Sequence, residues 1–422
     1  MIFKLYKERF WKMKVQRVEK QMIKPTNEYF PMLDHFCFLS KNLYNHANYI
    51  VRQSFVKDNK WIRYGELDKQ LKADKDYPDY AEMPTAQAAQ QTLRLLDKNW
   101  KSFFVSIKDW SENKDKYLGK PKLPGYVNKN GRKSLIITNQ NCKLKDGIIH
   151  FPKSFKGFVC KFCCCNRPDF VKLNQVRFLP HNNCIVIEIV YEVEIIDIVK
   201  QSQNYISIDI GVDNLVTVTN SFGKQPFIIN GKPLKSVNQY YNKQVSKYRS
   251  IAKQMNGVDY TKRMDILTEK RNRKIEDYLH KTSREIIEYC KKYNVSKIII
   301  GNNKEWKQNS KLSKKVNQHF VQIPYNRLIQ MLEYKAQEIG VTVIITEESY
   351  TSGTSFVDNE IPVKENYNKS RRIKRGLFKT SDGSVINADV NGSYQIMKKV
   401  IPNEEILWNR GCAYQPFRVA IV

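Results

Sequence analysis

The sequence lacks several features that would point to a membrane or to secretion. No apolar run approaches the length needed to cross a bilayer, and the N-terminus shows no apolar core of a secretory signal. A basic amphipathic helix of the kind that lies on a membrane surface is also missing. We therefore expect a soluble, cytoplasmic protein without a membrane partner.

Cysteines are present, but their spacing does not make a framework. The nine cysteines are an odd number in a highly charged chain, which does not indicate a set of disulfides. Cys160 and Cys163 have the two-residue gap of a zinc half-site and Cys184 could be a third ligand, yet no second paired half-site follows. We interpret these cysteines as structural and expect no bound zinc, with a zinc site as the alternative.

Acidic residues are scarce beside basic ones. The chain has 72 Lys and Arg against 42 Asp and Glu, a formal net charge of +30. Such an excess repels itself in a compact protein, and a polyanion such as nucleic acid would neutralise it. The 422 residues, 41% of them apolar, are enough for two or three domains with real cores. Composition thus favours a multidomain protein that binds nucleic acid.

Two acids lie in otherwise apolar surroundings. Asp209 is in the middle of a strand-like run at 205–211, and Asp389 is in the first turn of a helix that stops near Pro402. A carboxylate in such a place is costly unless a cation meets it. We therefore expect a shared divalent-metal site, with two unrelated structural acids as the alternative. Because both side chains are hard oxygen ligands, magnesium is favoured over zinc.

The first half of the chain predicts a small β-barrel with helices inserted into it. Apolar spacing of three and four residues predicts helices from about 32 to 51 and from 86 to 110, which form a module at 33–116. Short strands with turns between them surround this module, at 13–18, 134–138, 147–151, 171–173 and 184–193. The barrel would comprise residues 1–32 and 117–200.

The second half, residues 201–422, predicts one α/β domain. Its elements follow the order of a ribonuclease H-type fold, with an acid in the first strand and another at a late helix. We expect strands at 205–210, 215–219 and 226–229, basic helices at 235–292, a strand at 297–300, a helix at 324–340, a strand at 341–346 and the helix of Asp389. The fold class is therefore α/β and multidomain.

Several segments resemble the TnpB family, the transposon-encoded OrfB proteins ancestral to type V CRISPR effectors. Residues 206–217 resemble the family's first RuvC motif, and Asn387-Ala-Asp-Val-Asn-Gly-Ser-Tyr394 resembles its third. Tyr350-Thr-Ser352 resembles a Tyr-Thr-Ser segment of the family. Further likeness extends to its basic helix at 269–284, to its recognition helix at 88–104 and to the linker after it at 119–126.

The resemblance implies a function as well as a fold. It implies an RNA-guided DNA endonuclease with a RuvC nuclease domain at 201–422, a wedge β-barrel and a helical recognition (REC) module. Its partners would be a guide RNA derived from the transposon end and double-stranded target DNA beside a short adjacent motif. The bacterial protein would be cytoplasmic, nucleoid-associated when bound to DNA, and monomeric. The alternatives are a nuclease-dead guided repressor and a transposase that joins DNA strands.

The family's second RuvC motif is changed in this chain. That motif usually ends a strand with glutamate, but here Gly301 occupies the position. The next expected strand, 341–346, ends in Glu347 and Glu348, and one of these could reach the same metals. Because successive strand side chains point to opposite faces, only one should do so, and we favour Glu348 with Glu347 as the alternative. An inactive site is the remaining possibility.

By this resemblance, Asp209, Glu348 and Asp389 would be the catalytic residues and the metal ligands. Asp209 would be shared by two Mg²⁺ ions, and Glu348 and Asp389 would each hold one of them. Mn²⁺ could substitute for Mg²⁺. No side-chain nucleophile is needed, and no Ser-His-Asp or Cys-His arrangement stands out in the sequence.

The family's zinc ribbon is also changed. Residues 351–387 contain no cysteine, and Ser355 stands where the first would be, so we expect a degenerate, metal-free insertion at 353–378. Its basic side chains could contact phosphates, and a solvated loop is the alternative. The basic residues of this insertion are Lys369, Arg371, Arg372, Lys374 and Arg375.

Two other groups of residues are candidates for contact with nucleic acid. Gln87 and Gln91 lie one turn apart on a predicted helix, and glutamine can bond adenine in the major groove. The basic helix would contact the backbone of the guide or the heteroduplex, with a solvated helix face as the alternative. Its candidate residues are Lys270, Arg271, Arg273, Lys274, Lys281 and Arg284.

Overall fold

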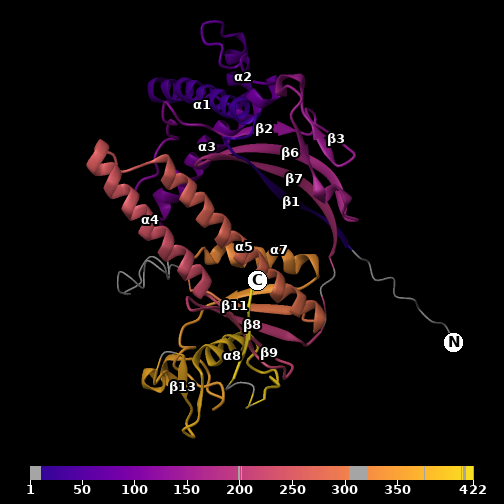
Figure 1. The fold of residues 1–422 in the computed structure, drawn as a ribbon, viewed down its shortest axis with the longest axis vertical. Coiled ribbons are helices and arrows are strands. Elements are labelled where there is room, and N and C mark those ends of the chain that lie inside the picture. The colour runs from indigo at the N-terminus through magenta and orange to yellow at the C-terminus, as the bar shows by residue number, and fades with distance from the viewer. Residues whose placement is uncertain are drawn as a thin grey trace, which may run out of the picture. The chain divides into compact units, whose positions relative to one another are not determined.

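The structure is a computed structural model that describes residues 11–197, 200, 202–303, 322–374, 376–409, 411 and 415–421. Within these residues the chain divides into two compact units, which we call the N-terminal unit (13–195) and the C-terminal unit (from 196 onward) (Figure 1). No helix in the described ranges is long and apolar enough to span a membrane. Arg375, one of the predicted basic residues, lies outside the described residues.

The N-terminal unit is built on two antiparallel sheets. The larger has the order β1-β7-β6-β2 and comprises β1 (Trp11–Ile23), β2 (Leu135–Thr138), β6 (Phe170–His181) and β7 (Cys184–Asp197). The smaller has the order β3-β4-β5 and comprises β3 (Lys143–Lys145), β4 (Ile148–His150) and β5 (Val159–Lys161). In the described residues these ladders form two separate sheets, so the single closed barrel remains a prediction.

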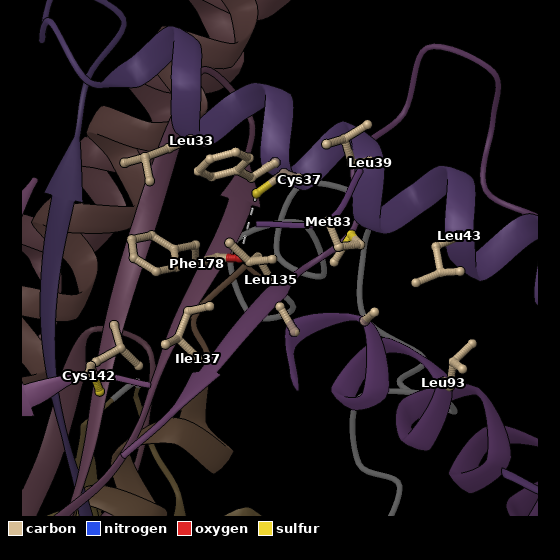
Figure 2. Packing of buried hydrophobic residues seen from close by; sticks show 14 of the residues in the cluster. Leu33, Cys37, Leu39, Leu43, Met83, Leu93, Leu135, Ile137, Cys142 and Phe178 are labelled. Atoms are coloured by element: carbon tan, nitrogen blue, oxygen red, sulfur yellow. Dashed lines mark hydrogen bonds between the residues drawn. The ribbon is translucent and has the colours of Figure 1, made fainter. Parts of the chain in front are cut away.

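Three helices lie between β1 and β2 in the chain, and their assignment to an inserted module remains a prediction. They are α1 (Phe30–Asp58), α2 (Tyr64–Ala73) and α3 (Ala86–Glu112), and α2 was not predicted. Figure 2 shows the apolar face of α1, with Leu33 and Cys37, against Leu135 and Phe178 of the larger sheet. Burial of this continuous face stabilises the helices far more than their own hydrogen bonds do.

The C-terminal unit contains a six-stranded sheet with the order β12-β11-β8-β9-β10-β15. The first three strands of this unit, β8, β9 and β10, pair antiparallel. β11 pairs in parallel with β8, and β12 pairs in parallel with β11. Along the chain, these strands and the helices between them follow the element order that the sequence predicted, apart from the edge strand β15 and a short hairpin before the last helix. The strands are β8 (Tyr205–Ile210), β9 (Asn214–Asn220), β10 (Phe227–Asn230), β11 (Lys297–Gly301), β12 (Thr342–Thr346) and β15 (Phe417–Val419).

Helices cover both faces of this sheet, which explains why its strands read as apolar runs. Ile206 and Ile208 of β8 pack into a core with α5 and α7, whereas Tyr205 packs with Ile396 of α8 (Figure 1). The helices are α4 (Lys232–Asn256), α5 (Lys262–Lys292), α7 (Tyr325–Glu338) and α8 (Ala388–Val400). Alternation along β8 therefore places Ser207 and Asp209 on the α8 face.

Short elements complete both units. The segment between β12 and α8 carries a two-stranded hairpin of β13 (Leu377–Lys379) and β14 (Val385–Asn387). Single 3₁₀ turns are η1 (Lys114–Lys116), η2 (Lys153–Phe155), η3 (Cys163–Asn166), η4 (Lys364–Asn366) and η5 (Lys369–Arg371). The turns η4 and η5 lie within the insertion predicted at 353–378, and the hairpin begins where that range ends.

Candidate metal centre

Asp209 lies on β8 where that strand packs against α8. The side chain is half-buried and faces the helix at Gly392. A Cβ atom at position 392 would lie only 3.1 Å from Asp209 Oδ2, which is tighter than almost all real contacts of that kind. Glycine is therefore needed at 392 so that the carboxylate can approach the helix backbone.

The helix that carries Asp389 is fixed at its start and along its length. Asn387 caps α8, and its Oδ1 accepts hydrogen bonds from the backbone N–H of Asp389 (3.0 Å) and of Val390 (3.1 Å). Ser207 Oγ on β8 donates to the Ser393 carbonyl at 2.6 Å, and Ser393 Oγ donates to the Ser207 carbonyl at 3.0 Å. This reciprocal pair holds α8 on β8 and thereby brings Asp389 toward Asp209.

Glu348 fills the space that the missing side chain of Gly301 leaves. A Cβ atom at 301 would lie 2.6 Å from Glu348 Cγ and 2.8 Å from Glu348 Oε1. The backbone there is also fixed, because Asn303 Oδ1 accepts from the Glu348 N–H at 2.8 Å and the Asn302 N–H donates to the Thr346 carbonyl at 2.8 Å. Glu348 thus enters the site from the end of β12, at the point where an acid was expected on β11.

Glu347 points elsewhere. Gly301 pairs with Thr346 in the parallel ladder, so alternation puts Glu348 on the α8 face and Glu347 on the other side. Glu347 is exposed, its carboxylate accepts a hydrogen bond from the Ser349 hydroxyl, and its carbonyl accepts one from Lys399 Nζ at 3.1 Å. The preference for Glu348 over Glu347 therefore agrees with the geometry.

The three acids act on one another electrostatically. Burial raises the pKa of Asp209 well above its usual range, and the neighbouring carboxylates of Glu348 and Asp389 raise it further. Burial also raises the pKa of Glu348, to about 7, although Lys399 opposes this rise. Such repulsion marks a site whose charge the protein alone does not balance.

The cations at the site are few and peripheral. Arg372 Nη2 lies 3.2 Å from Asp389 Oδ1, and its positive charge offsets part of the rise in the pKa of Asp209. Asn214 Nδ2 donates to the other oxygen of Asp389 at 2.7 Å. Glu348 Oε1 is buried and has no hydrogen-bond partner among the described residues. An orphaned carboxylate oxygen beside two further acids fits a hard divalent cation, so the donor set suits Mg²⁺ or Mn²⁺.

Two segments of the chain match known protein families. Residues 188–307, which include Asp209, match the OrfB_IS605 family, described as a probable transposase. Residues 325–396, which include Glu348 and Asp389, match the Cas12f1-like TNB domain. The second half of the chain is thus similar to OrfB/TnpB-type proteins and to Cas12f1-like proteins.

Two relatives and one solved structure are also similar to this chain. The TnpB-like protein ORF457 of Acidianus two-tailed virus is 23% identical over 394 residues, 86% of this chain and 82% of that protein. The CRISPR-associated endodeoxyribonuclease Cas12f2 of a Micrarchaeota archaeon is 24% identical over 236 residues, 51% of this chain and 40% of that protein. In the cryo-EM structure of the Cas12f1-sgRNA-target DNA complex, a chain with 16% identity matches with a TM-score of 0.52, covering 87% of this chain and 82% of its own length. That last likeness confirms the α/β multidomain fold and nothing finer.

The insertion of this TnpB-like chain is held by ion pairs and amides. Arg371, predicted to contact phosphate, instead bonds inside the protein: Nη1 lies 2.6 Å from Glu360 Oε1, and Nη2 lies 2.9 Å from Asp358 Oδ2. Asn391 of α8 bonds the backbone of the same segment, donating to the Thr354 carbonyl at 2.8 Å. The structure therefore gives Arg371 a structural role, which the sequence alone did not reveal.

The candidates on the basic helix α5 separate into three groups. Arg271 is half-buried and bonds Asn238 Oδ1 and the Gln322 carbonyl, so its guanidinium is used within the protein. Three others pair with an acid one turn away, namely Arg273 with Glu269, Lys281 with Asp277, and Arg284 with Glu288. The pairs of Lys281 and Arg284 are exposed on both sides and therefore weak, so these two side chains remain available to phosphate, whereas Arg273 pairs with a buried acid. Lys270 and Lys274 are exposed and make no ion pair within the described residues.

The other candidates lie in the N-terminal unit. The Gln87 amide is bonded to Thr138 and to Gln140 at the end of β2, so it is not presented to a base edge in this conformation. Gln91 is half-buried one turn further along α3. Cys160 is buried in the core, where burial raises the pKa of its thiol to about 12, whereas Cys163 is exposed. The thiols of this pair thus differ in environment, and their structural role remains a prediction.

Proposed function

We propose that this chain is an RNA-guided DNA endonuclease of transposon origin, which hydrolyses target DNA at the site of Asp209, Glu348 and Asp389. The observation that carries the proposal is Glu348: it occupies the space above Gly301, and its Oε1 is buried without a hydrogen-bond partner in the described residues. A nuclease-dead chain would have no use for three converging, half-buried acids, which cost stability. A guided binder without cleavage is therefore the less favoured function.

The three carboxylates would hold two divalent cations, Mg²⁺ or Mn²⁺. When bound, such ions lower the pKa of water and stabilise charge on the leaving oxygen of a phosphodiester. Asp209, central and flanked by the other two acids, is the natural shared ligand. Asn214 holds one oxygen of Asp389 and so orients this carboxylate.

Arg372 would bind the substrate. Its guanidinium lies 3.2 Å from Asp389 Oδ1 and is 41% exposed, so it stands at the rim of the acidic site. A guanidinium binds phosphate oxygens as well as it binds carboxylate oxygens. Arg372 can therefore exchange its carboxylate partner for a phosphate of the DNA strand without a large movement.

The partners would be a guide RNA and double-stranded DNA. The net charge of +30 and the exposed lysines of α5 support this proposal, since neutralising a phosphate backbone requires such a surplus. Recognition of a short adjacent motif would belong to the N-terminal unit, with its wedge sheets and its helical recognition module. The proposal takes the protein as a monomer.

The test combines cleavage with a metal-binding readout. The chain would be purified with the RNA that accompanies it, and that RNA would be sequenced so that a matched DNA target can be made. Asp209→Asn, Glu348→Gln and Asp389→Asn should each abolish Mg²⁺-dependent cleavage and weaken Mn²⁺ binding measured by calorimetry, with RNA binding retained. Glu347→Gln, the adjacent and equally charged control, should cut and bind Mn²⁺ normally.

Two outcomes would contradict the proposal. If Glu347→Gln lost cleavage and Glu348→Gln kept it, the assignment of the third ligand would be wrong by one residue. If the wild-type chain bound its RNA and matched DNA but neither cut the DNA nor bound Mn²⁺, the chain would be a guided binder and not a nuclease.

A further inference from the structure

Helices α4 and α5 enclose a cavity of about 350 Å³ that the proposed nuclease chemistry does not use. The two helices pack side by side as a long hairpin (Figure 1). α4 is poorly buried for its length, since Leu234, Asn238 and Ala252 are the buried members of its 25 residues. A helix with so little burial gains little from its own core, which favours a role in contact with a partner.

Two consecutive tyrosines line the cavity and differ in exposure and in their contacts. Tyr241 is held in place, because its hydroxyl lies 3.0 Å from Thr268 Oγ1 and the Arg271 guanidinium lies 5.6 Å from its ring centroid. Tyr240 is 62% exposed, so its ring lies open to solvent at the cavity. Leu267 adds an apolar surface. The cavity thus offers a flat ligand one rigid wall and one exposed aromatic ring.

Positive charge at the cavity is available rather than neutralised. Lys270 and Lys274 lie one turn apart on α5, and both line it. Neither makes an ion pair within the described part of the chain, whereas Arg273, between them, pairs with Glu269 at 3.5 Å. Two lysine ammonium groups beside an aromatic wall suit a ligand that carries both a flat ring and a phosphate.

We propose that this cavity binds one unpaired nucleotide of a nucleic acid strand, with the base stacked on Tyr240 and its phosphates between Lys270 and Lys274. The volume is within the range of pockets that enclose small organic groups, roughly 300–1,000 Å³. A paired base has both faces covered by its neighbours in the duplex, so only an unpaired one can enter. The proposal rests on the proposed function only in taking nucleic acid as the partner.

The test measures binding of the full-length chain, cleared of nucleic acid at high salt, to labelled 12-nucleotide single strands of RNA and of DNA and to a duplex of the same length. Tyr240→Ala should weaken binding of at least one single strand by about 5- to 100-fold and leave duplex binding unchanged, because stacking on one aromatic ring is lost. Tyr240→Phe should bind like the wild type, and the RNA and DNA strands will show which source the cavity prefers. The exposed Tyr260, outside the cavity, provides the control Tyr260→Ala.

The lysines give an independent readout. Lys270→Ala combined with Lys274→Ala should lower the slope of log affinity against log salt on single strands by about 1.4, that is roughly 0.7 for each phosphate contact. The exposed Lys253 of α4 provides a matched loss of one charge in Lys253→Ala, which should leave the slope unchanged.

Three results would overturn the proposal. The first is that Tyr240→Ala binds single strands within twofold of the wild type, and the second is that it weakens duplex binding equally. The third is that Tyr240→Phe binds as weakly as Tyr240→Ala. Each result would contradict stacking of an unpaired base on Tyr240. Unchanged folding of the Tyr240 variants would be verified by thermal unfolding. Because cleavage is not measured here, failure of this proposal leaves the metal-centre variants untouched, whereas a chain that binds no nucleic acid at all would contradict the proposed function itself.

Discussion

Substitutions at Gly301 and Glu348 provide the sharpest test of how the site is built. A Cβ atom at 301 would lie 2.6 Å from Glu348 Cγ, 2.8 Å from its Oε1 and 2.5 Å from Ile396 Cδ1, all closer than side chains tolerate. Gly301→Ala should therefore lower the free energy of unfolding by about 1–3 kcal/mol, the usual cost of an overpacked core. Two of these three contacts belong to Glu348, so the cost should depend on that residue.

The dependence is measured by a double-mutant cycle. Glu348→Ala removes both close contacts, and the terminal methyl of Ile396 can rotate away, so Gly301→Ala should cost about 1 kcal/mol less in that background. The assay is urea unfolding in EDTA at fixed pH. Gly65→Ala is the control, because nothing lies within 4 Å of a Cβ atom at Gly65, and this substitution should be neutral or slightly stabilising.

A carboxylate placed at position 301 should restore metal binding in a chain that lacks Glu348. Gly301→Glu in the Glu348→Ala background puts a carboxylate on the end of β11, where the space is then open, and it should restore part of the Mn²⁺ binding that Glu348→Ala loses. The reasoning would be refuted by additive costs, that is, a coupling below about 0.5 kcal/mol between Gly301→Ala and Glu348→Ala. A Gly301→Ala variant as stable as the wild type would refute it equally.

Two further predictions concern charge. Burial raises the pKa of Glu348 from the usual 4.5 to about 7 in the folded, metal-free chain. Between these two pH values the unfolded chain has lost the Glu348 proton and the folded chain still holds it, so the free energy of unfolding should fall by up to about 3 kcal/mol as pH rises from 4.5 to 7. Glu348→Gln should flatten this part of the pH profile in urea unfolding. Arg371 is 16% exposed between Asp358 and Glu360, so Arg371→Met should cost roughly 3 kcal/mol and expose 353–378 to protease, whereas Lys369→Met, an exposed charge-matched control, should do neither. A pH profile that is unchanged by Glu348→Gln, or equal effects of the two Met variants, would contradict these predictions.

The sequence was most informative where the two-residue alternation of strand side chains decides which face a residue lies on. The alternation at 205–210 predicted β8 with the bounds that the structure has, and the same period of two separated Glu347 from Glu348 beyond β12. A local cap likewise marks the start of α8, because Asn387 bonds the backbone of the next turn. The strand alternation needs no knowledge of distant contacts, so residue order alone predicts it, whereas the Asn387 cap was found only in the structure.

What the sequence could not give are partners across the fold. A basic run does not say which of its members faces an acid, and so Arg371 and Arg271 looked like phosphate contacts although both are bonded inside the protein. Gln87 likewise fits a helix face in the sequence, but its partners Thr138 and Gln140 lie some fifty residues away in the chain. The number of strands was hard to predict for the same reason, since three-residue strands such as β3 and β5 have no period of their own.

The segment after β12 shows how the site can be assembled without a metal-bound ribbon. One face of α8 is fixed to β8 by Ser393, and this fixes Asp389 near Asp209. Other side chains of α8 hold the insertion, through Asn391 on the Thr354 carbonyl and Lys398 Nζ on the Asn359 carbonyl at 2.8 Å.

The insertion then returns to the site. Arg371 is locked by Asp358 and Glu360, so the adjacent Arg372 is delivered to Asp389 by a segment that is anchored on the same helix as that acid. A single helix therefore sets the positions of the acid and of its cation together, through ion pairs and amide hydrogen bonds.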